Sequence, residues 1–154
     1  IKNGLKIRKR YKEEIIVCGH LNKEDYVSVL SQCHSFVMPS RGEAFCIPAL
    51  EAMALGIPVI YTKDTGMDDF CIGSAVGSTE TPCVGAVSTL QNLCTANNTW
   101  SEINVAELAI AMRNAYMQWN SEESNKQRKA VIKRAKQYSH QKVGKQLKEL
   151  LNDS

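Results

Sequence analysis

The sequence predicts an α/β fold with a small parallel sheet of three to four strands flanked by helices. Three short apolar runs, each ended by turn-forming residues, predict buried strands at residues 15–18, 35–39 and 57–61. Helical periodicity separates these runs, and a strand–helix–strand–helix–strand order is typical of parallel sheets with right-handed crossovers. We therefore expect a ligand crevice beyond the carboxyl ends of the strands.

The composition is that of a soluble globular protein. The chain has 154 residues, of which 44% are hydrophobic and 23% charged, which fits one domain with an ordinary core. It contains no apolar run of about 18 residues and opens with no signal peptide, so we expect a cytoplasmic protein. Its six cysteines follow no metal-binding or C-x-x-C spacing. This scatter favours buried free thiols over a disulfide framework.

The formal net charge is only +3, but basic residues gather near the start of the chain and again over residues 126–148. A solvated helix face explains these clusters, and peripheral contact with an anionic membrane surface is the alternative. Only Tyr11 and Tyr138 lie among these basic residues, fewer aromatic side chains than a stacking platform for nucleic acid requires. We therefore expect no nucleic-acid partner.

Local signals place the elements of the first half in order. The first dozen residues are interpreted as a helix remnant or tail, and a start without methionine suggests a piece of a longer protein. Asn22 can cap the helix after the first strand. Pro48 suits a first helical turn and Gly56 suits a helix end, which predicts a helix over residues 47–55.

The second half is less regular at first and then becomes helical. Residues 64–100 are interpreted as a long loop with a fourth strand at 84–87, so the predicted core covers residues 15–88. Helices are expected over residues 104–151, beginning with an Asn-x-x-Glu capping box and continuing over 121–138. The inward-facing apolar residues are expected to be Val105, Leu108, Met112 and Trp119 on the first of these helices, and Val143, Leu147 and Leu150 on a last helix capped by Ser139.

Two carboxylates stand out around the second strand. Glu43 follows that strand on a glycine-containing loop, and Glu51 lies one turn into the next helix. Helical side chains lean toward the N-terminus, so Glu51 leans toward the loop of Glu43. Free amides at the helix start, around Cys46, would hold an anion such as a phosphate. The residues alone leave three readings open: solvated carboxylates, the acid and base of a glycosidase, or acceptors for sugar and ribose hydroxyls.

The surrounding residues carry a family pattern. It comprises Pro39-Ser40, Glu43-Ala44-Phe45, Pro48 to Ala54 and Gly56 to Ile60, with further matches at Val17-x-Gly19, Glu24-Asp25, Ser35 to Met38, Thr65-Gly66 and Asp69. This segment resembles the E-x7-E signature of retaining glycosyltransferases of the GT-B fold, in the group usually called family 4. The resemblance implies a Rossmann-like, nucleotide-sugar-binding domain and is dense over residues 15–70.

The resemblance also implies a role for each matched residue. Glu43 would be the catalytic residue, contacting donor-sugar hydroxyls and supporting positive charge at the anomeric centre, while Glu51 would hold the ribose hydroxyls. The retaining reaction would proceed on one face of the sugar, with the leaving phosphate assisting the acceptor and with no metal or other cofactor. The remaining donor-binding residues implied are Ser40 and Gly66, the backbone amides of Phe45, Cys46 and Ile47, and His20 near the nucleobase, for which a plain turn residue is the alternative.

Departures from the pattern limit what the chain does alone. Ala44, Cys46 and Thr65 stand where the family typically has glycine. Counterparts of the acceptor domain and of the family's basic pair for the diphosphate are missing before Glu43, so we expect the C-terminal portion of a donor-binding domain that is inactive in isolation.

The implied partners are a UDP- or GDP-sugar donor and a saccharide, lipid or protein acceptor bound by the missing domain. A GT-B nucleotide-sugar epimerase and a non-catalytic nucleotide-sugar-binding module remain alternatives, and unpaired strand edges leave a homodimer open. Trp100 is interpreted as a core or loop anchor, with sugar stacking as the alternative. Asp64, Asp68 and Asp69 are interpreted as solvated loop residues.

Overall fold

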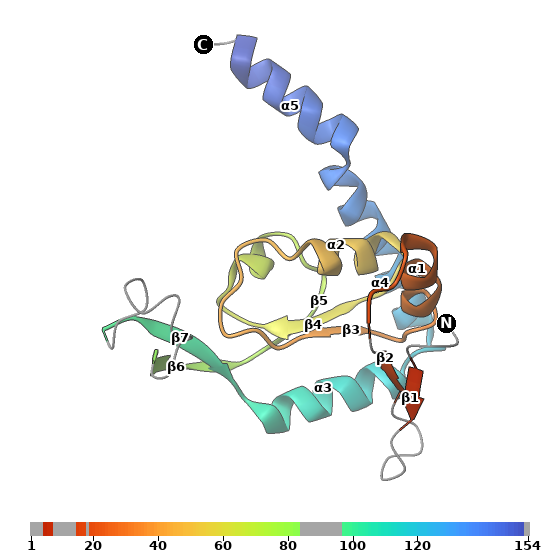
Figure 1. Ribbon diagram of the computed structural model, residues 1–154, viewed down its shortest axis with the longest axis vertical. Helices are drawn as coiled ribbons and strands as arrows, with labels where there is room; N and C mark the ends of the chain where they lie inside the picture. Colours follow the sequence, from red (N-terminus) through yellow and green to blue (C-terminus); the bar gives the residue numbers. More distant parts are fainter. Residues whose placement is uncertain (1–4, 8–14, 18, 84–96, 153–154) are drawn as a thin grey trace. The chain divides into compact units, whose positions relative to one another are not determined.

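The computed structural model describes residues 5–7, 15–17, 19–83 and 97–152 (Figure 1). These residues fall into two compact units, Ile1–Cys33 and His34–Ser154, each of which is described by itself.

The N-terminal unit contains a strand pair and a helix. Strand β1 (Leu5–Ile7) pairs antiparallel with β2 (Ile15–Val17), and helix α1 (Lys23–Leu30) follows. The expectation of a helical start was wrong for β1, where the Leu-Lys-Ile alternation has the period of a strand. The strand at β2 was predicted correctly, but its pairing with β1 places it outside the parallel sheet. Asn22 caps α1 as expected, because its Oδ1 accepts a hydrogen bond from the Asp25 amide at 2.8 Å.

The C-terminal unit is built on a three-stranded parallel sheet in the order β3-β4-β5. The strands are β3 (Phe36–Met38), β4 (Val59–Thr62) and β5 (Gly73–Val76). Helix α2 (Ile47–Ala54) connects β3 to β4 and lies on one face of the sheet, with α3 (Val105–Met117) on the other face (Figure 1). The predicted fold class, a small parallel sheet flanked by helices, is confirmed.

The segment expected to be a long loop contains ordered elements. The short 3-10 helix η1 (Gly66–Asp69) leads into β5, and β6 (Ser78–Pro82) pairs antiparallel with β7 (Thr99–Ile103). The loop prediction was wrong here because these strands are short and polar, so they carry little hydrophobic periodicity. The strand predicted at residues 84–87 lies outside the described residues.

The helices of the second half are α3 (Val105–Met117), α4 (Glu122–Ala135), the 3-10 turn η3 (Lys136–Tyr138) and α5 (His140–Asn152). Asn104 caps α3 as predicted, since its side chain accepts from the amides of Ala106 and Glu107 at 3.1 and 3.2 Å. These helices agree closely with the predicted helical region.

The predicted inward face of α3 was right only in part, and that of α5 was wrong. On and just after α3, Leu108 and Trp119 are partly buried, whereas Val105 is 71% and Met112 47% exposed. The carboxylate of the exposed Glu107 accepts a hydrogen bond from the Gly77 amide at 3.3 Å. On α5, which continues from η3 away from the sheet of its unit (Figure 1), the apolar row stays exposed. That row contains Val143, Leu147, Leu150 and Leu151.

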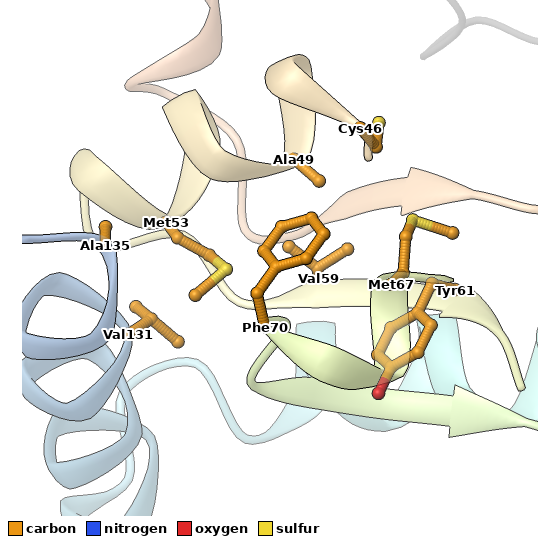
Figure 2. Close-up of a cluster of buried hydrophobic side chains, with 9 residues drawn as sticks. All are labelled: Cys46, Ala49, Met53, Val59, Tyr61, Met67, Phe70, Val131 and Ala135. Atoms are coloured by element: carbon orange, nitrogen blue, oxygen red, sulfur yellow. The ribbon is translucent and has the colours of Figure 1, made fainter. Parts of the chain in front are cut away.

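The core lies between α2, β4, η1 and α4 (Figure 2). Met53 of α2, Val59 of β4, Phe70 after η1 and Val131 of α4 are at most 1% exposed and point into the same cluster. Burying such side chains stabilises a fold by about 1.5–3 kcal/mol each relative to exposure. This cluster fixes α2, and with it the loop that precedes α2, against the strands.

Four cysteines fall within the described residues, and all are free thiols; Cys46 is buried as expected, whereas Cys33, Cys71 and Cys83 are only partly buried. Among the described helices, none is long and apolar enough to cross a membrane.

Candidate functional site

A shallow crevice opens beyond the carboxyl ends of β3 and β4. Its volume is about 560 Å³, and three segments line it: the loop after β3, the segment from the end of β4 through η1, and the β6–β7 strand pair. This is the position at which ligands bind in open parallel α/β sheets. Its lining residues are Arg41, Gly42, Glu43, Asp64, Thr65, Gly66, Asp68, Asp69, Glu80, Thr99, Trp100 and Ser101.

Two of the predicted site residues, Glu43 and Gly66, line this crevice together. The Gly66 amide donates a hydrogen bond to the carbonyl oxygen of Glu43 at 2.9 Å, so the two loops are joined at their tips. The carboxylate of Glu43 accepts from the amide of Ala44 at 3.1 Å, which holds this side chain along its own loop. The predicted convergence of the loops after the second and third apolar runs is therefore present.

Glycine is required at position 66 by the closeness of the two loops. A Cβ atom added there would collide with the carbonyl oxygen of Ala44 and would lie 2.9 Å from that of Glu43. Contacts this short between a side-chain carbon and backbone oxygens are strongly repulsive, so any larger residue must push the loops apart. The absence of a side chain at Gly66 therefore sets the width of this end of the crevice.

Helix α4 anchors the far side of η1. The Arg134 guanidinium donates to the carbonyl oxygens of Asp69 and, at 3.3 Å, of Phe70. It also lies over the ring of Tyr138, 5.4 Å from the centroid. Since Asp69 lines the crevice, this arginine holds one wall in place from outside.

A clasp joins the loop after β3 to β7. The Arg41 guanidinium donates to both carboxylate oxygens of Glu102, at 2.6 and 3.2 Å, and stacks over the ring of Trp100 with 4.5 Å to its centroid. The backbone is tied as well, because the Ser101 amide donates to the carbonyl oxygen of Arg41 at 2.9 Å. The hydrogen bond and charge of Glu102 raise the pKa of Arg41, which remains a cation.

Three predicted residues stand at the start of α2. Cys46 is buried, and the exposed Ile47 begins the helix. The half-exposed ring of Phe45 packs against Phe70 and Tyr138, with centroids 4.6 and 5.9 Å apart. None of the three is among the residues that line the crevice, and of the three only Phe45 and Ile47 present surface at the start of α2.

The chemistry of Cys46 follows from its burial. Burial raises the pKa of this thiol, the Ala49 amide at the helix start opposes that change, and the charge of Glu43 raises the pKa further. The thiol is therefore protonated at neutral pH and is a poor nucleophile.

The other predicted residues lie apart from the crevice lining. Ser40 is on the loop after β3, and its Oγ is buried with no hydrogen-bond partner among the described residues. Glu51 is a partly buried residue of α2. His20 is exposed and belongs to the N-terminal unit.

The crevice has an acidic lining. Five carboxylates line it, and the charge of the lining cation, Arg41, is already engaged by Glu102. Asp64 has a left-handed backbone with φ of 61°, and its amide donates to Asp68 Oδ2 at 2.8 Å. The pKa of Tyr61 is raised to about 12, mainly because its hydroxyl is buried and secondly because it is hydrogen-bonded to Asp68. Within the described part of the chain, no group of three or more His, Cys, Asp or Glu side chains could hold a metal ion. The carboxylates lining the crevice are Glu43, Asp64, Asp68, Asp69 and Glu80.

Sequence reasoning missed the clasp, whereas Asp64, Asp68 and Asp69 are exposed, as predicted, and also line the crevice. Trp100 and Glu102 alternate along β7, and this period of two places both side chains on one strand face, where both meet Arg41. The Thr-Trp-Ser-Glu-Ile alternation was a signal that could have found the strand. No local signal indicates that the strand lies against Arg41.

A second cavity of about 690 Å³ lies between the sheet, α3 and α4. His34 at its edge packs against Trp119 and Tyr116, with centroids 4.8 and 5.2 Å away. Arg128 stacks on the ring of Trp119 at 4.4 Å. These ring contacts connect the residue that precedes the sheet to α3, the turn after it and α4.

Comparison with known proteins shows a similarity to glycosyltransferases over the first half of the chain. Residues 5–80 match the family model of glycosyl transferases group 1, and this matched segment contains both Glu43 and Gly66. A curated relative is the O-antigen chain mannosyltransferase B of Escherichia coli, which is 33% identical over 90 residues. The alignment covers 57% of this chain and 23% of that protein, so the chain spans about a quarter of its relative's length. These similarities support glycosyl transfer in general.

Proposed function

We propose that this chain supplies part of the donor site of a retaining GT-B glycosyltransferase. The enzyme would transfer a hexose from a UDP- or GDP-sugar to a saccharide, lipid or protein acceptor. One observation carries the proposal: the loops of Glu43 and Gly66 meet at a crevice beyond the carboxyl ends of β3 and β4, within the segment similar to glycosyl transferases group 1.

Glu43 is the proposed catalytic residue. Its ionised carboxylate can accept hydrogen bonds from two sugar hydroxyls, and its place on the crevice lining makes it available to do so. Cleavage of a glycosidic bond builds positive charge at the anomeric carbon, which a nearby carboxylate stabilises. The leaving phosphate would take the proton of the acceptor hydroxyl, so that attack and departure share one face of the sugar.

The start of α2 is the proposed diphosphate contact. Backbone amides of Phe45, Cys46 and Ile47 stand at a helix N-terminus, where free N–H groups and the helix dipole favour an anion. A protonated Cys46 adds no negative charge beside the phosphates. This surface adjoins the crevice through the Glu43 loop, which leads directly into the helix.

The remaining donor contacts follow from the same scheme. Glu51 of α2 would bind the ribose hydroxyls, Ser40 would contribute a hydroxyl from the loop after β3, and His20 would lie near the nucleobase. Gly66 would allow close approach of the donor, because the loops around it leave no space for a side chain. No metal is assigned a role.

The acidic lining supports an uncharged sugar. Five acidic residues line the crevice, and the charge of Arg41 is paired with that of Glu102. A negatively charged sugar in the crevice would therefore be repelled. A neutral hexose instead offers many hydroxyl donors to those oxygens. A mannosyltransferase among the relatives agrees with this preference.

We further propose that the chain is the C-terminal portion of a donor-binding domain, acting in the cytoplasm. Its core would be residues 15–88 and its C-terminal helices residues 104–151. The acceptor site and the basic groups that complete the diphosphate contact would come from other parts of a longer protein. On this view the chain binds donor weakly and does not transfer the sugar by itself.

Binding titrations on the chain test these assignments. UDP-glucose and GDP-mannose are titrated beside UDP and GDP alone, against the wild type, Glu43→Gln and Glu51→Gln. We expect Glu43→Gln to weaken nucleotide-sugar binding about tenfold and to leave free nucleotide unchanged, as for loss of a charged hydrogen bond. Glu51→Gln should weaken both. Glu122→Gln, on the exposed start of α4, is the control.

Turnover is measured in a longer protein that contains this segment. Sugar transferred with retained configuration supports the proposal, whereas release of an epimerised nucleotide sugar would identify an epimerase. Donor binding without either product would identify a binding module. If neither glutamine variant changes affinity or turnover, the roles assigned to Glu43 and Glu51 are wrong.

A further inference from the structure

We propose that the β6–β7 strand pair forms the sugar-contacting wall of the crevice. Trp100 is the side chain against which a neutral sugar ring packs, and the Arg41–Glu102 pair positions this wall beside Glu43. This inference rests on the proposed function, because it names a further part of the same donor site.

The wall lies largely outside the segment that matches the family model. The family match ends at residue 80, within β6, whereas Trp100 and Ser101 belong to β7. The pair nevertheless contributes residues 80 and 99–101 to the crevice lining. A sugar beside Glu43 therefore meets a surface that the family match does not specify.

The clasp fixes the wall at a defined distance from the catalytic loop. Arg41 binds Glu102 through two hydrogen bonds and stacks on Trp100, while its carbonyl oxygen accepts from the Ser101 amide at 2.9 Å. A bidentate guanidinium–carboxylate pair constrains orientation as well as distance. Since Arg41 and Glu43 share one short loop, movement of β7 would move Glu43 too.

Trp100 has the chemistry that a sugar ring requires. It is partly buried and lines the crevice, with the Arg41 guanidinium over its ring. An indole ring offers a large apolar surface together with an N–H donor, and sugar rings combine an apolar C–H face with a hydroxyl rim. The carboxylates across the crevice accept those hydroxyls, so the ring and the acidic lining recognise different parts of one neutral hexose.

Tryptophan fluorescence reports this contact directly, because the chain has two tryptophans. In a Trp119→Phe variant the remaining tryptophan is Trp100, and UDP-glucose or GDP-mannose should change its emission. UDP or GDP alone should change it little. In the matched Trp100→Phe variant the remaining tryptophan is Trp119, which lines the other cavity, and its emission should not respond.

Affinity separates a sugar contact from a merely structural wall. We expect Trp100→Ala to weaken binding of UDP-glucose or GDP-mannose about tenfold, as for truncation of a buried aromatic anchor. Binding of UDP or GDP alone should be unchanged. Equal weakening of nucleotide and nucleotide sugar, or no weakening of either, would overturn the inference.

The clasp has its own test in a charge exchange. Arg41→Glu and Glu102→Arg should each lower the preference for nucleotide sugar over nucleotide, and the double variant should restore part of it. If the double variant recovers none of the preference for nucleotide sugar over nucleotide, the pair does not position the wall. If the wild type binds neither nucleotide sugar at millimolar concentration, the proposed function itself fails. If it binds them and Trp100→Ala binds equally well, only the sugar-contacting wall fails.

Discussion

The amide of Gly66 donates to the carbonyl oxygen of Glu43, and this 2.9 Å hydrogen bond joins the two loops that form one end of the crevice. The same closeness leaves no room for a side chain at position 66. The loop that carries Glu43, the proposed catalytic residue, is thus held by Gly66, which lies in the connection between β4 and β5. Gly66 is therefore a sensitive position to test.

Gly66→Ala should destabilise the fold by about 1–3 kcal/mol, because its Cβ would overlap the Ala44 carbonyl and force the loops apart. Chemical denaturation measures the loss. Gly42→Ala is the matched control on the same crevice, since a Cβ at Gly42 would meet no atom within 4 Å and the control should change stability by less than about 0.5 kcal/mol. Equal stability of the two variants would show that the loops separate at no cost.

Met53→Ala should cost about 2–5 kcal/mol of stability, because Met53 is fully buried in the core beneath α2 and truncation leaves a cavity. Met117→Ala removes the same atoms from a side chain that is 74% exposed, and its effect should stay within about 0.5 kcal/mol. Thermal unfolding of both variants measures the contrast. A similar loss of stability in the two variants would mean that α2 does not pack on this core.

Stability should fall as the pH rises from about 9 to about 12. Burial raises the pKa of Cys71 from 9.0 to about 12 and that of Tyr61 from 10.0 to about 12. In this window the unfolded chain releases protons that the folded chain retains, so alkali favours unfolding. Denaturation midpoints at stepped pH measure the slope. Cys71→Ser should flatten it, and an unchanged slope in that variant would exclude Cys71 as a source.

Gly144→Ala should stabilise α5 by up to about 1 kcal/mol, because alanine is the better helix former and the added Cβ meets no atom within 4 Å. Circular dichroism should show more helix or a more gradual loss of helix on heating. Leu147→Gln tests the exposed apolar row beside it and should leave the midpoint of unfolding unchanged, since Leu147 is 56% exposed. A large drop for Leu147→Gln would mean that this row is covered in solution.

Local signals were enough for much of the fold. Apolar runs predicted β2, β3 and β4, and caps at Asn22, Asn104 and Ser139 correctly marked helix starts. They failed where tertiary contacts replace local periodicity. β1 and β7 are short strands defined by their partners, and Val105 and Met112 of α3 are exposed although the helical periodicity predicts them to be inward.

The sequence by itself determined the α/β class, the loop of Glu43 and the helix that follows it, because turn residues, caps and apolar spacing act over a few neighbouring positions. Only the tertiary structure decided which side chains share the crevice. It brought Gly66 to Glu43 and set Arg41 against Trp100 and Glu102 on β7. These contacts join residues far apart in the chain. They could not be predicted because strand pairing and loop packing, unlike helix capping, have no signal in the residues that lie between the two partners.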